Sequence, residues 1–357
     1  MLIYVCLSSH GFGHASRQAA LLTEIHQLRP DYRIIISSKV NQSFLKLIFK
    51  DIPVEFRTFR WDIGMIQHDA FDINIDITLV ELNKLDKILP SKIKREAEWI
   101  ISQKEKSIIL ADIPYSANYL SELTDSKLIW FGNFGWDDIY LPFDDFLYEH
   151  RLKAYLNYQK GDLLLRCPFS LPMNWNIPEI SIGLTSGKPK EISDSFKSKL
   201  VSNSRPIVVV GFGGFGYRIQ PKLFERWPDH IFLLTSENQH NNEINKLENI
   251  LFIPNGSRIL DVIGYCDRIL TKPGYSTFCE SIINSIGIHS FNRRNFIESD
   301  RLINGLKLFS KHRILDEDFL ASGNWELDQP LNKPQLDSFE INGVEVAAKE
   351  IITFINL

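Results

Sequence analysis

The sequence predicts an α/β protein with two doubly wound parallel sheets, one in each half of the chain. Three observations lead to this expectation. The chain has 357 residues, about twice the usual length of a domain. Its apolar runs are short and do not alternate with polar residues, as in strands that are buried on both faces. Segments with helical spacing of apolar residues separate these runs, which implies parallel strands joined by helices.

In the first half, predicted strands and helices alternate along the chain. Strands are expected at 1–7, 32–37, 54–59, 107–111, 127–131 and 162–166, and helices at 15–28, 41–49, 78–103, 115–123 and 146–159. We expect Pro90 to break or kink the long helix, because proline has no amide hydrogen to donate. A stretch rich in Pro, Asn, Ser and Gly follows and indicates a connection between domains, with a short strand at 179–182.

The second half repeats this architecture. Strands are expected at 206–210, 230–235, 250–253, 268–271 and 287–291, and helices at 221–227, 257–265, 275–284, 297–310 and 344–355. The predicted organisation is therefore a first domain at 1–168, a linker at 169–189, a second domain at 190–335 and a C-terminal helical segment at 336–357 that packs back on the first domain. We expect the two domains to face each other across a cleft.

Composition excludes several classes of protein. A net charge of −4 argues against a broad nucleic-acid-binding surface. The four cysteines are far apart and have no zinc-ligand spacing, so neither a structural zinc site nor a disulfide framework is expected. No signal peptide or transmembrane run is recognisable, and we expect a cytoplasmic protein. Five cations among apolar residues in 78–103 leave peripheral membrane contact open, although a solvated helix face explains them as well.

Two loops of the first half carry residues suited to catalysis. His14 follows the first strand in a glycine-containing turn that opens a helix, and Asp112 follows the strand at 107–111. Ligands of doubly wound sheets bind at the carboxyl ends of the strands, so both side chains should lie at such a site. His14 can be a general base that Asp112 orients, with Gly11 and Gly13 near a phosphate. The alternatives are a buried structural histidine and a helix N-cap aspartate.

The loop after the strand at 127–131 combines glycines, aromatic residues and acids. Trp136, Asp137 and Asp138 are candidates for recognising a sugar or polyol, together with Trp61 and Asp62. A rigid structural loop is the alternative. Adjacent acids point apart, so this pair is only a weak indication of glycoside hydrolysis.

Two glycine-containing loops of the second half suit a nucleotide. Gly211–Gly216 formally fits the dinucleotide-binding motif, in which the helix begins within the glycines. Here the helix is expected to begin some five residues later, at Pro221, which is an ideal first helical residue, so a dinucleotide site is not expected. We therefore expect Gly213 and Gly214 to contact a ligand through the backbone. The second loop runs from a strand through Gly274 into a helix with hydroxyl groups in its first turn, which is typical of an anion site.

The segments TKPGYSTFCESI and RRNFIESDRL resemble the donor domain of GT-B glycosyltransferases, in particular the group of the lipid I N-acetylglucosaminyltransferase and the monogalactosyldiacylglycerol synthases. The segments SSHGFGHASR and GNFGWDDIY resemble the glycosyltransferase-like N-terminal region of L-arabinokinase. No GHMP-type phosphate loop is recognisable, so kinase activity is not implied.

The resemblance implies a UDP-sugar donor, no metal and no further cofactor. Gly274, Tyr275, Ser276 and Thr277 would hold the diphosphate, Glu280 the ribose, Asn255 and Gly256 the base, and Arg294 and Glu298 the donor sugar. Plant-type UDP-sugar transferases have a His–Asp dyad at the places of His14 and Asp112, in which the histidine deprotonates the acceptor hydroxyl for a single inverting displacement. Glutamines that the peptidoglycan enzyme has near Arg294 are absent, so the resemblance does not identify the sugar.

The sequence thus predicts a glycosyltransferase whose acceptor is a small molecule, a glycan or a lipid. Two other functions stay open at this point. One is a sugar-nucleotide epimerase or hydrolase on the same fold, and the other is a sugar-nucleotide-binding module without catalysis.

Overall fold

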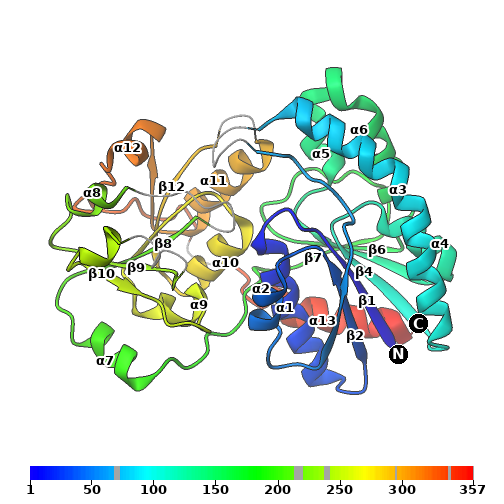
Figure 1. Cartoon of the computed structure of the whole chain (residues 1–357), viewed down its shortest axis with the longest axis horizontal. Coiled ribbons are helices and arrows are strands. Elements are labelled where there is room, and N and C mark those ends of the chain that lie inside the picture. Colours follow the sequence, from blue (N-terminus) through cyan, green and yellow to red (C-terminus); the bar gives the residue numbers. More distant parts are fainter. Residues whose placement is uncertain (68–72, 213–219, 237–241, 294–295, 337–338, 357) are drawn as a thin grey trace. The chain divides into compact units, whose positions relative to one another are not determined.

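The computed structural model describes residues 1–67, 73–212, 220–236, 242–293, 296–336 and 339–356. The chain divides into two compact units, each with its own sheet (Figure 1). The first unit comprises Met1–Thr185, Asn295–Arg301 and Glu340–Leu357, and the second comprises Ser186–Arg294 and Leu302–Phe339. The chain therefore enters the second unit within the predicted linker. The return of 295–301 to the first unit had no signal in the sequence.

The first unit contains a seven-stranded sheet in the order β3-β2-β1-β4-β5-β6-β7. Its strands are β1 (Leu2–Leu7), β2 (Arg33–Ser38), β3 (Val54–Thr58), β4 (Ser107–Asp112), β5 (Lys127–Gly132), β6 (Leu163–Arg166) and β7 (Glu179–Ser181). All pairings between them are parallel, as the unbroken apolar runs predict. Tyr4, for example, is paired with Ile35 on one side and Ile109 on the other.

Helices cover both faces of this sheet. They are α1 (Phe12–Leu28), α2 (Gln42–Ile48), α3 (Ile75–Ser102), α4 (Ala117–Thr124), α5 (Trp136–Tyr140), α6 (Asp144–Tyr158) and α13 (Gly343–Asn356). Helices α3, α4 and α6 pack together over the core face that contains Tyr4 and Cys6, and α1 packs with α13. Helix α3 continues through Pro90, so a break there is wrong, and the predicted alternative of a kink stays a prediction.

The C-terminal helix belongs to the first unit. Lys127 at the start of β5 donates to the carbonyl oxygen of Phe354 over 3.2 Å. Before α13 the chain passes so close to the segment after β7 that a Cβ on Gly343 would lie 2.0 Å from the carbonyl oxygen of Gly183. Glycine is required at this crossing, which fixes where the chain enters the final helix.

The second unit contains a six-stranded parallel sheet in the order β10-β9-β8-β11-β12-β13. Its strands are β8 (Ile207–Gly211), β9 (Ile231–Leu234), β10 (Ile250–Phe252), β11 (Arg268–Thr271), β12 (Gly287–Phe291) and β13 (His312–Leu315). Its helices are α7 (Asp194–Val201), α8 (Pro221–Phe224), α9 (Ile259–Val262), α10 (Tyr275–Ile283) and α12 (Glu317–Ser322), and α11 (Ile297–Phe309) begins in the first unit and ends in the second.

Most strands and helices lie within a few residues of the prediction. Helix α8 begins at Pro221 as expected but ends at Phe224, earlier than the predicted Trp227. The elements that the sequence analysis missed are α5, α7, β13 and α12. The four cysteines are free and buried.

Candidate active site

His14 and Asp112 lie where the strand order of the first sheet reverses. Strands β1, β2 and β3 extend to one side, and β4 to β7 extend to the other. In doubly wound sheets this switch point lies beside the two neighbouring loops that diverge, here those after β1 and β4. Gly11 supports the first loop structurally, because its φ of 109° is accessible to glycine at little cost. Helix α1 begins at the next residue and carries His14 in its first turn.

The two side chains form a buried hydrogen bond. Nδ1 of His14 lies 2.7 Å from Oδ1 of Asp112, and the exposed fractions of the two residues are 7% and 0%. A carboxylate accepts hydrogen bonds, so this contact favours the tautomer with the proton on Nδ1. The Nε2 lone pair is then available to take a proton from a substrate.

Arg17 completes this cluster, and sequence analysis missed it. It lies one helical turn after His14, and its guanidinium Nε donates to Oδ2 of Asp112 over 2.7 Å while Nη2 forms an ion pair with Oδ1. Gln18 donates to Oδ2 over 3.0 Å. The available signal was the spacing of three residues from His14, which places both side chains on one face of a helix.

These contacts hold Asp112 in its ionised form. Burial by itself raises the pKa of this carboxyl, but the charges of Arg17 and His14 and their hydrogen bonds outweigh burial, and the net pKa is lowered. The carboxylate is therefore a fixed negative charge that orients His14.

The cluster extends to Asn133 and Glu298. Arg17 donates to Oδ1 of Asn133 over 2.6 Å, and Nδ2 of Asn133 donates to Glu298 over 2.8 Å. The sequence analysis assigned Glu298 to the donor domain, and this is corrected because 295–301 belong to the first unit. Arg294, its predicted companion, lies outside the described residues.

The residues predicted to bind the acceptor are buried in the first unit. The exposed fraction is at most 8% for Trp61, Asp62, Trp136, Asp137 and Asp138. Asp62 accepts a hydrogen bond from the indole of Trp136 over 2.9 Å, and burial raises the pKa of its carboxyl. The indole of Trp61 donates to the carbonyl oxygen of Ser37 over 3.0 Å.

Asp137 and Asp138 serve the packing of the segment after β6. Asp137 accepts from the indole of Trp175 over 2.9 Å, and Asp138 accepts from the amide of Met173 over 3.0 Å. Burial and the neighbouring charge of Asp138 raise the pKa of Asp137 to about 7. Residues 136–140 were expected in a loop that recognises a sugar or polyol, or in a rigid structural loop, and they form helix α5, in which both acids are buried. Their role in acceptor binding stays a prediction.

The second sheet has its own switch point, between β8 and β11. Gly274 is the N-cap of α10, whose first turn contains Tyr275, Ser276 and Thr277, and the N-terminus of a helix favours an anion. Glu280 follows in the second turn and is half-buried, and burial raises its pKa to about 7. Asn255 and Gly256 form an exposed turn after β10. Gly213 and Gly214 lie outside the described residues.

Within the described parts of the chain, no group of three or more His, Cys, Asp or Glu side chains is placed to hold a metal ion. No helix among the same residues is long and apolar enough to cross a membrane.

Comparisons with known proteins identify the fold. No protein-family model matches the chain, and no curated protein matches its sequence. Many solved structures do match. The Arabidopsis thaliana protein UGT89C1, complexed with UDP-L-rhamnose, is 12% identical with a TM-score of 0.63, covering 100% of this chain and 99% of that one. A UDP-glucose:anthocyanidin 3-O-glucosyltransferase in complex with UDP is 13% identical with a TM-score of 0.64, covering 99% and 94%.

Another match is UGT2 of Phytolacca americana, complexed with UDP-2-fluoro-glucose and pterostilbene. It is 12% identical with a TM-score of 0.58, covering 98% of this chain and 89% of that one. The chain therefore has the GT-B type fold with two Rossmann-like sheets, as the sequence predicts. The resemblance to the lipid I enzyme, the galactolipid synthases and arabinokinase stays a prediction.

Proposed function

We propose that the protein transfers a sugar from a UDP-sugar to an acceptor hydroxyl, with inversion and without a metal ion. The observation that carries this proposal is the buried contact of His14 with Asp112 at the switch point of the first sheet. Support for the donor comes from the similar folds, whose structures are printed as complexes with UDP or UDP-sugars.

In the proposed reaction, the acceptor oxygen attacks the anomeric carbon while the bond from that carbon to the diphosphate oxygen breaks. Nε2 of His14 takes the hydroxyl proton, and Asp112 stabilises the imidazolium that forms. UDP leaves with the electron pair of the broken bond. The first-turn amides of α10 would stabilise its diphosphate, and Glu280 would accept hydrogen bonds from the ribose.

Arg17 has a positioning role in this proposal. Its guanidinium fixes the Asp112 carboxylate through two parallel contacts, which determines the direction from which the carboxylate meets His14. The charge of Arg17 also keeps Asp112 ionised in its buried site. Asp112 therefore orients and stabilises the histidine and does not itself take the proton.

The test has two stages. Thermal unfolding is first measured with UDP, ADP and GDP, and UDP at a hundred times its dissociation constant should stabilise the protein by about 2.7 kcal/mol. Products are then analysed after incubation with a radiolabelled UDP-sugar and a panel of hydroxyl acceptors. A labelled conjugate supports transfer, whereas an epimer, free sugar alone, or binding without turnover would each replace the proposal with one of the other functions.

A further inference from the structure

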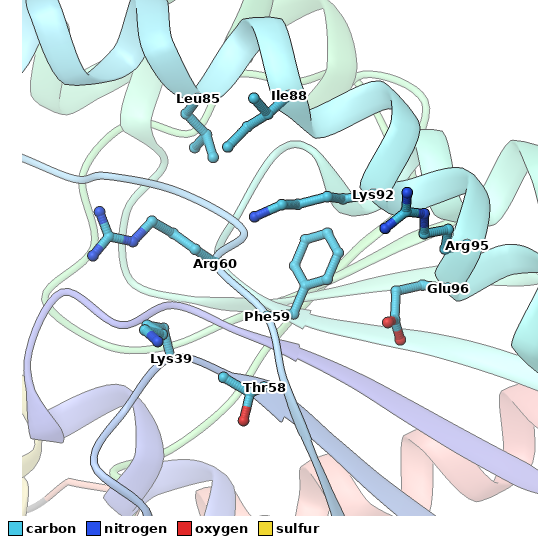
Figure 2. A pocket seen from close by; sticks show the side chains of 9 residues that line it. All are labelled: Lys39, Thr58, Phe59, Arg60, Leu85, Ile88, Lys92, Arg95 and Glu96. Atoms are coloured by element: carbon cyan, nitrogen blue, oxygen red, sulfur yellow. The ribbon is translucent and has the colours of Figure 1, made fainter.

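The first unit contains a cavity of about 450 Å³ beside α3 (Figure 2). Its lining comes from the residue after β2, from the end of β3 and the two residues that follow, and from the middle of α3. Four cations line it, namely Lys39, Arg60, Lys92 and Arg95. Figure 2 shows the Lys92 side chain extending from α3 back toward the segment of Phe59 and Arg60. The volume is in the range of about 300–1,000 Å³ that is typical of small-molecule sites.

The two arginines of this cavity differ from the other arginines of the first unit, because they form no ion pair with a described residue. Eight arginines lie between Met1 and Thr185, and six of them form ion pairs with carboxylates. Those six are Arg17, Arg29, Arg33, Arg57, Arg151 and Arg166. Arg60 and Arg95, which both line the cavity, pair with no residue that the structure describes, and the same holds for Lys39 and Lys92.

The one acid in the lining does not compensate for these charges. Glu96 already pairs with Arg57, whose Nε lies 2.6 Å from Oε2, and accepts from the hydroxyl of Tyr4 over 2.5 Å. Its negative charge is therefore already neutralised by Arg57, which does not line the cavity. The cavity has an excess of positive charge, which attracts an anion.

Part of the lining is apolar. Phe59 and Leu85 are buried, with exposed fractions of 6% and 5%, and Ile88 is 45% exposed. A lining that combines cations with aromatic and aliphatic side chains fits an organic molecule with an apolar body and a charged substituent better than a free inorganic ion.

The cavity is connected to the candidate active site by a short piece of chain. Arg60 lies two residues before Asp62, so their Cα atoms are at most about 7 Å apart. Asp62 accepts a hydrogen bond from the indole of Trp136. Burial raises the pKa of its carboxyl, and the charge of His14 partly offsets this rise. Between them, Trp61 is fixed by its hydrogen bond to Ser37 at the end of β2.

We propose that this cavity binds the anionic substituent, a carboxylate or phosphate, of the acceptor. The inference rests on the proposed function, because it names the class of acceptor for the same site. The specificity for the acceptor then depends on the four cations of the lining, Lys39, Arg60, Lys92 and Arg95. The proton transfer itself is carried out by His14.

Binding is tested first, independently of transfer. Phenyl phosphate and its neutral counterpart benzyl alcohol are titrated calorimetrically into the wild-type protein and into Arg60→Gln, Lys92→Gln and the control Lys94→Gln. Lys94 is an exposed cation on the same helix that does not line the cavity. We expect phenyl phosphate to bind, benzyl alcohol to bind much more weakly, and each cavity variant to lose about tenfold in affinity for phenyl phosphate. Equal binding of both probes, no binding, or an equal loss in Lys94→Gln would overturn the inference.

Binding to vesicles of phosphatidylglycerol is measured to distinguish a lipid headgroup from a small anionic acceptor as the ligand of the cavity. If Arg60→Gln abolishes vesicle binding while phenyl phosphate fails to bind the wild-type protein, the cavity is a site for lipid headgroups and the acceptor inference is wrong. UDP binding is measured on the same samples. If the wild-type protein binds phenyl phosphate but does not bind UDP, the proposed function is refuted and the anion site stands, so the two failures are distinguishable.

Transfer then tests specificity. With 4-hydroxybenzoate and 4-hydroxybenzamide as acceptors, Arg60→Gln should raise KM for the acid about tenfold, leave its kcat nearly unchanged and leave the amide unaffected. An equal effect on both acceptors would contradict recognition of charge.

Discussion

Nδ1 of His14 lies 2.7 Å from Oδ1 of Asp112 across 98 residues of sequence. The two residues meet because β1 and β4 are neighbours in the sheet although β2, β3 and α3 come between them in the chain. The contact is buried, and Arg17 binds both oxygens of the same carboxylate.

Arg17 and Asp112 should be coupled in stability. Arg17→Gln leaves a buried carboxylate with one charge partner fewer, and Asp112→Asn leaves a buried guanidinium without its carboxylate, so each should lower the free energy of unfolding by about 3–5 kcal/mol. The double variant should lose less than the sum, because neither charge is then left alone. Urea unfolding of the four proteins gives the coupling energy. Strict additivity would show that the ion pair contributes nothing specific.

Asp137→Asn should stabilise the protein at neutral pH. The pKa of Asp137 is raised from 3.8 to about 7, so between these values the unfolded state loses its proton before the folded state does. Wild-type stability therefore falls as the pH rises through this range, whereas the Asn variant lacks this loss. We expect a difference of about 2–4 kcal/mol that develops between the two pKa values and is constant above them.

Urea unfolding as a function of pH measures this difference. The exposed Asp145 provides the control, and Asp145→Asn should leave the pH profile of stability unchanged. A wild-type profile that is parallel to that of Asp137→Asn across the whole range would contradict the raised pKa.

UDP-sugar affinity should rise with pH near neutrality. Glu280 has a pKa of about 7, and its ionised form is the better acceptor for ribose hydroxyls. UDP-glucose is the appropriate ligand, because its diphosphate has no terminal phosphate that titrates in this range. Calorimetry should show tighter binding at about pH 8 than at about pH 6, and a flat profile for Glu280→Gln. A flat wild-type profile would remove Glu280 from the nucleotide site.

Turnover should survive EDTA. In the proposed mechanism the first-turn amides of α10 stabilise the leaving diphosphate, so no divalent ion is needed. Initial rates are compared before and after dialysis against EDTA. Loss of turnover that magnesium or manganese restores would contradict the metal-free mechanism.

The sequence could predict features that depend on local pattern. Unbroken apolar runs identified most strands, and His14 and Asp112 were found from their places after β1 and at the end of β4, because ligands of such sheets bind at the carboxyl ends of the strands. It could not predict that Asp137 and Asp138 turn inward, since that depends on Trp175 and Met173 from a distant segment. Helix α5 was missed because its five residues are too few to establish a helical period.

Long-range topology explains the other differences. Glu298 contacts Asn133 because the seven residues 295–301 return to the first unit. No periodic pattern in the sequence indicates such a return. The cations at the cavity come from three separate segments of the chain. That Arg60 and Arg95 form no ion pair with a described residue becomes apparent only by comparison with the other arginines, such as Arg33 and Arg57, which do.

The most direct measurement is kinetic and compares His14→Ala with the wild-type protein, using the best acceptor of the panel and UDP binding measured in parallel. If His14 is the general base, turnover should fall by about 10²–10⁴-fold while UDP affinity stays the same. His26→Ala, on the same helix, should retain full turnover as the control. Undiminished turnover in His14→Ala, or a loss that follows entirely from weaker UDP binding, would contradict the proposed mechanism.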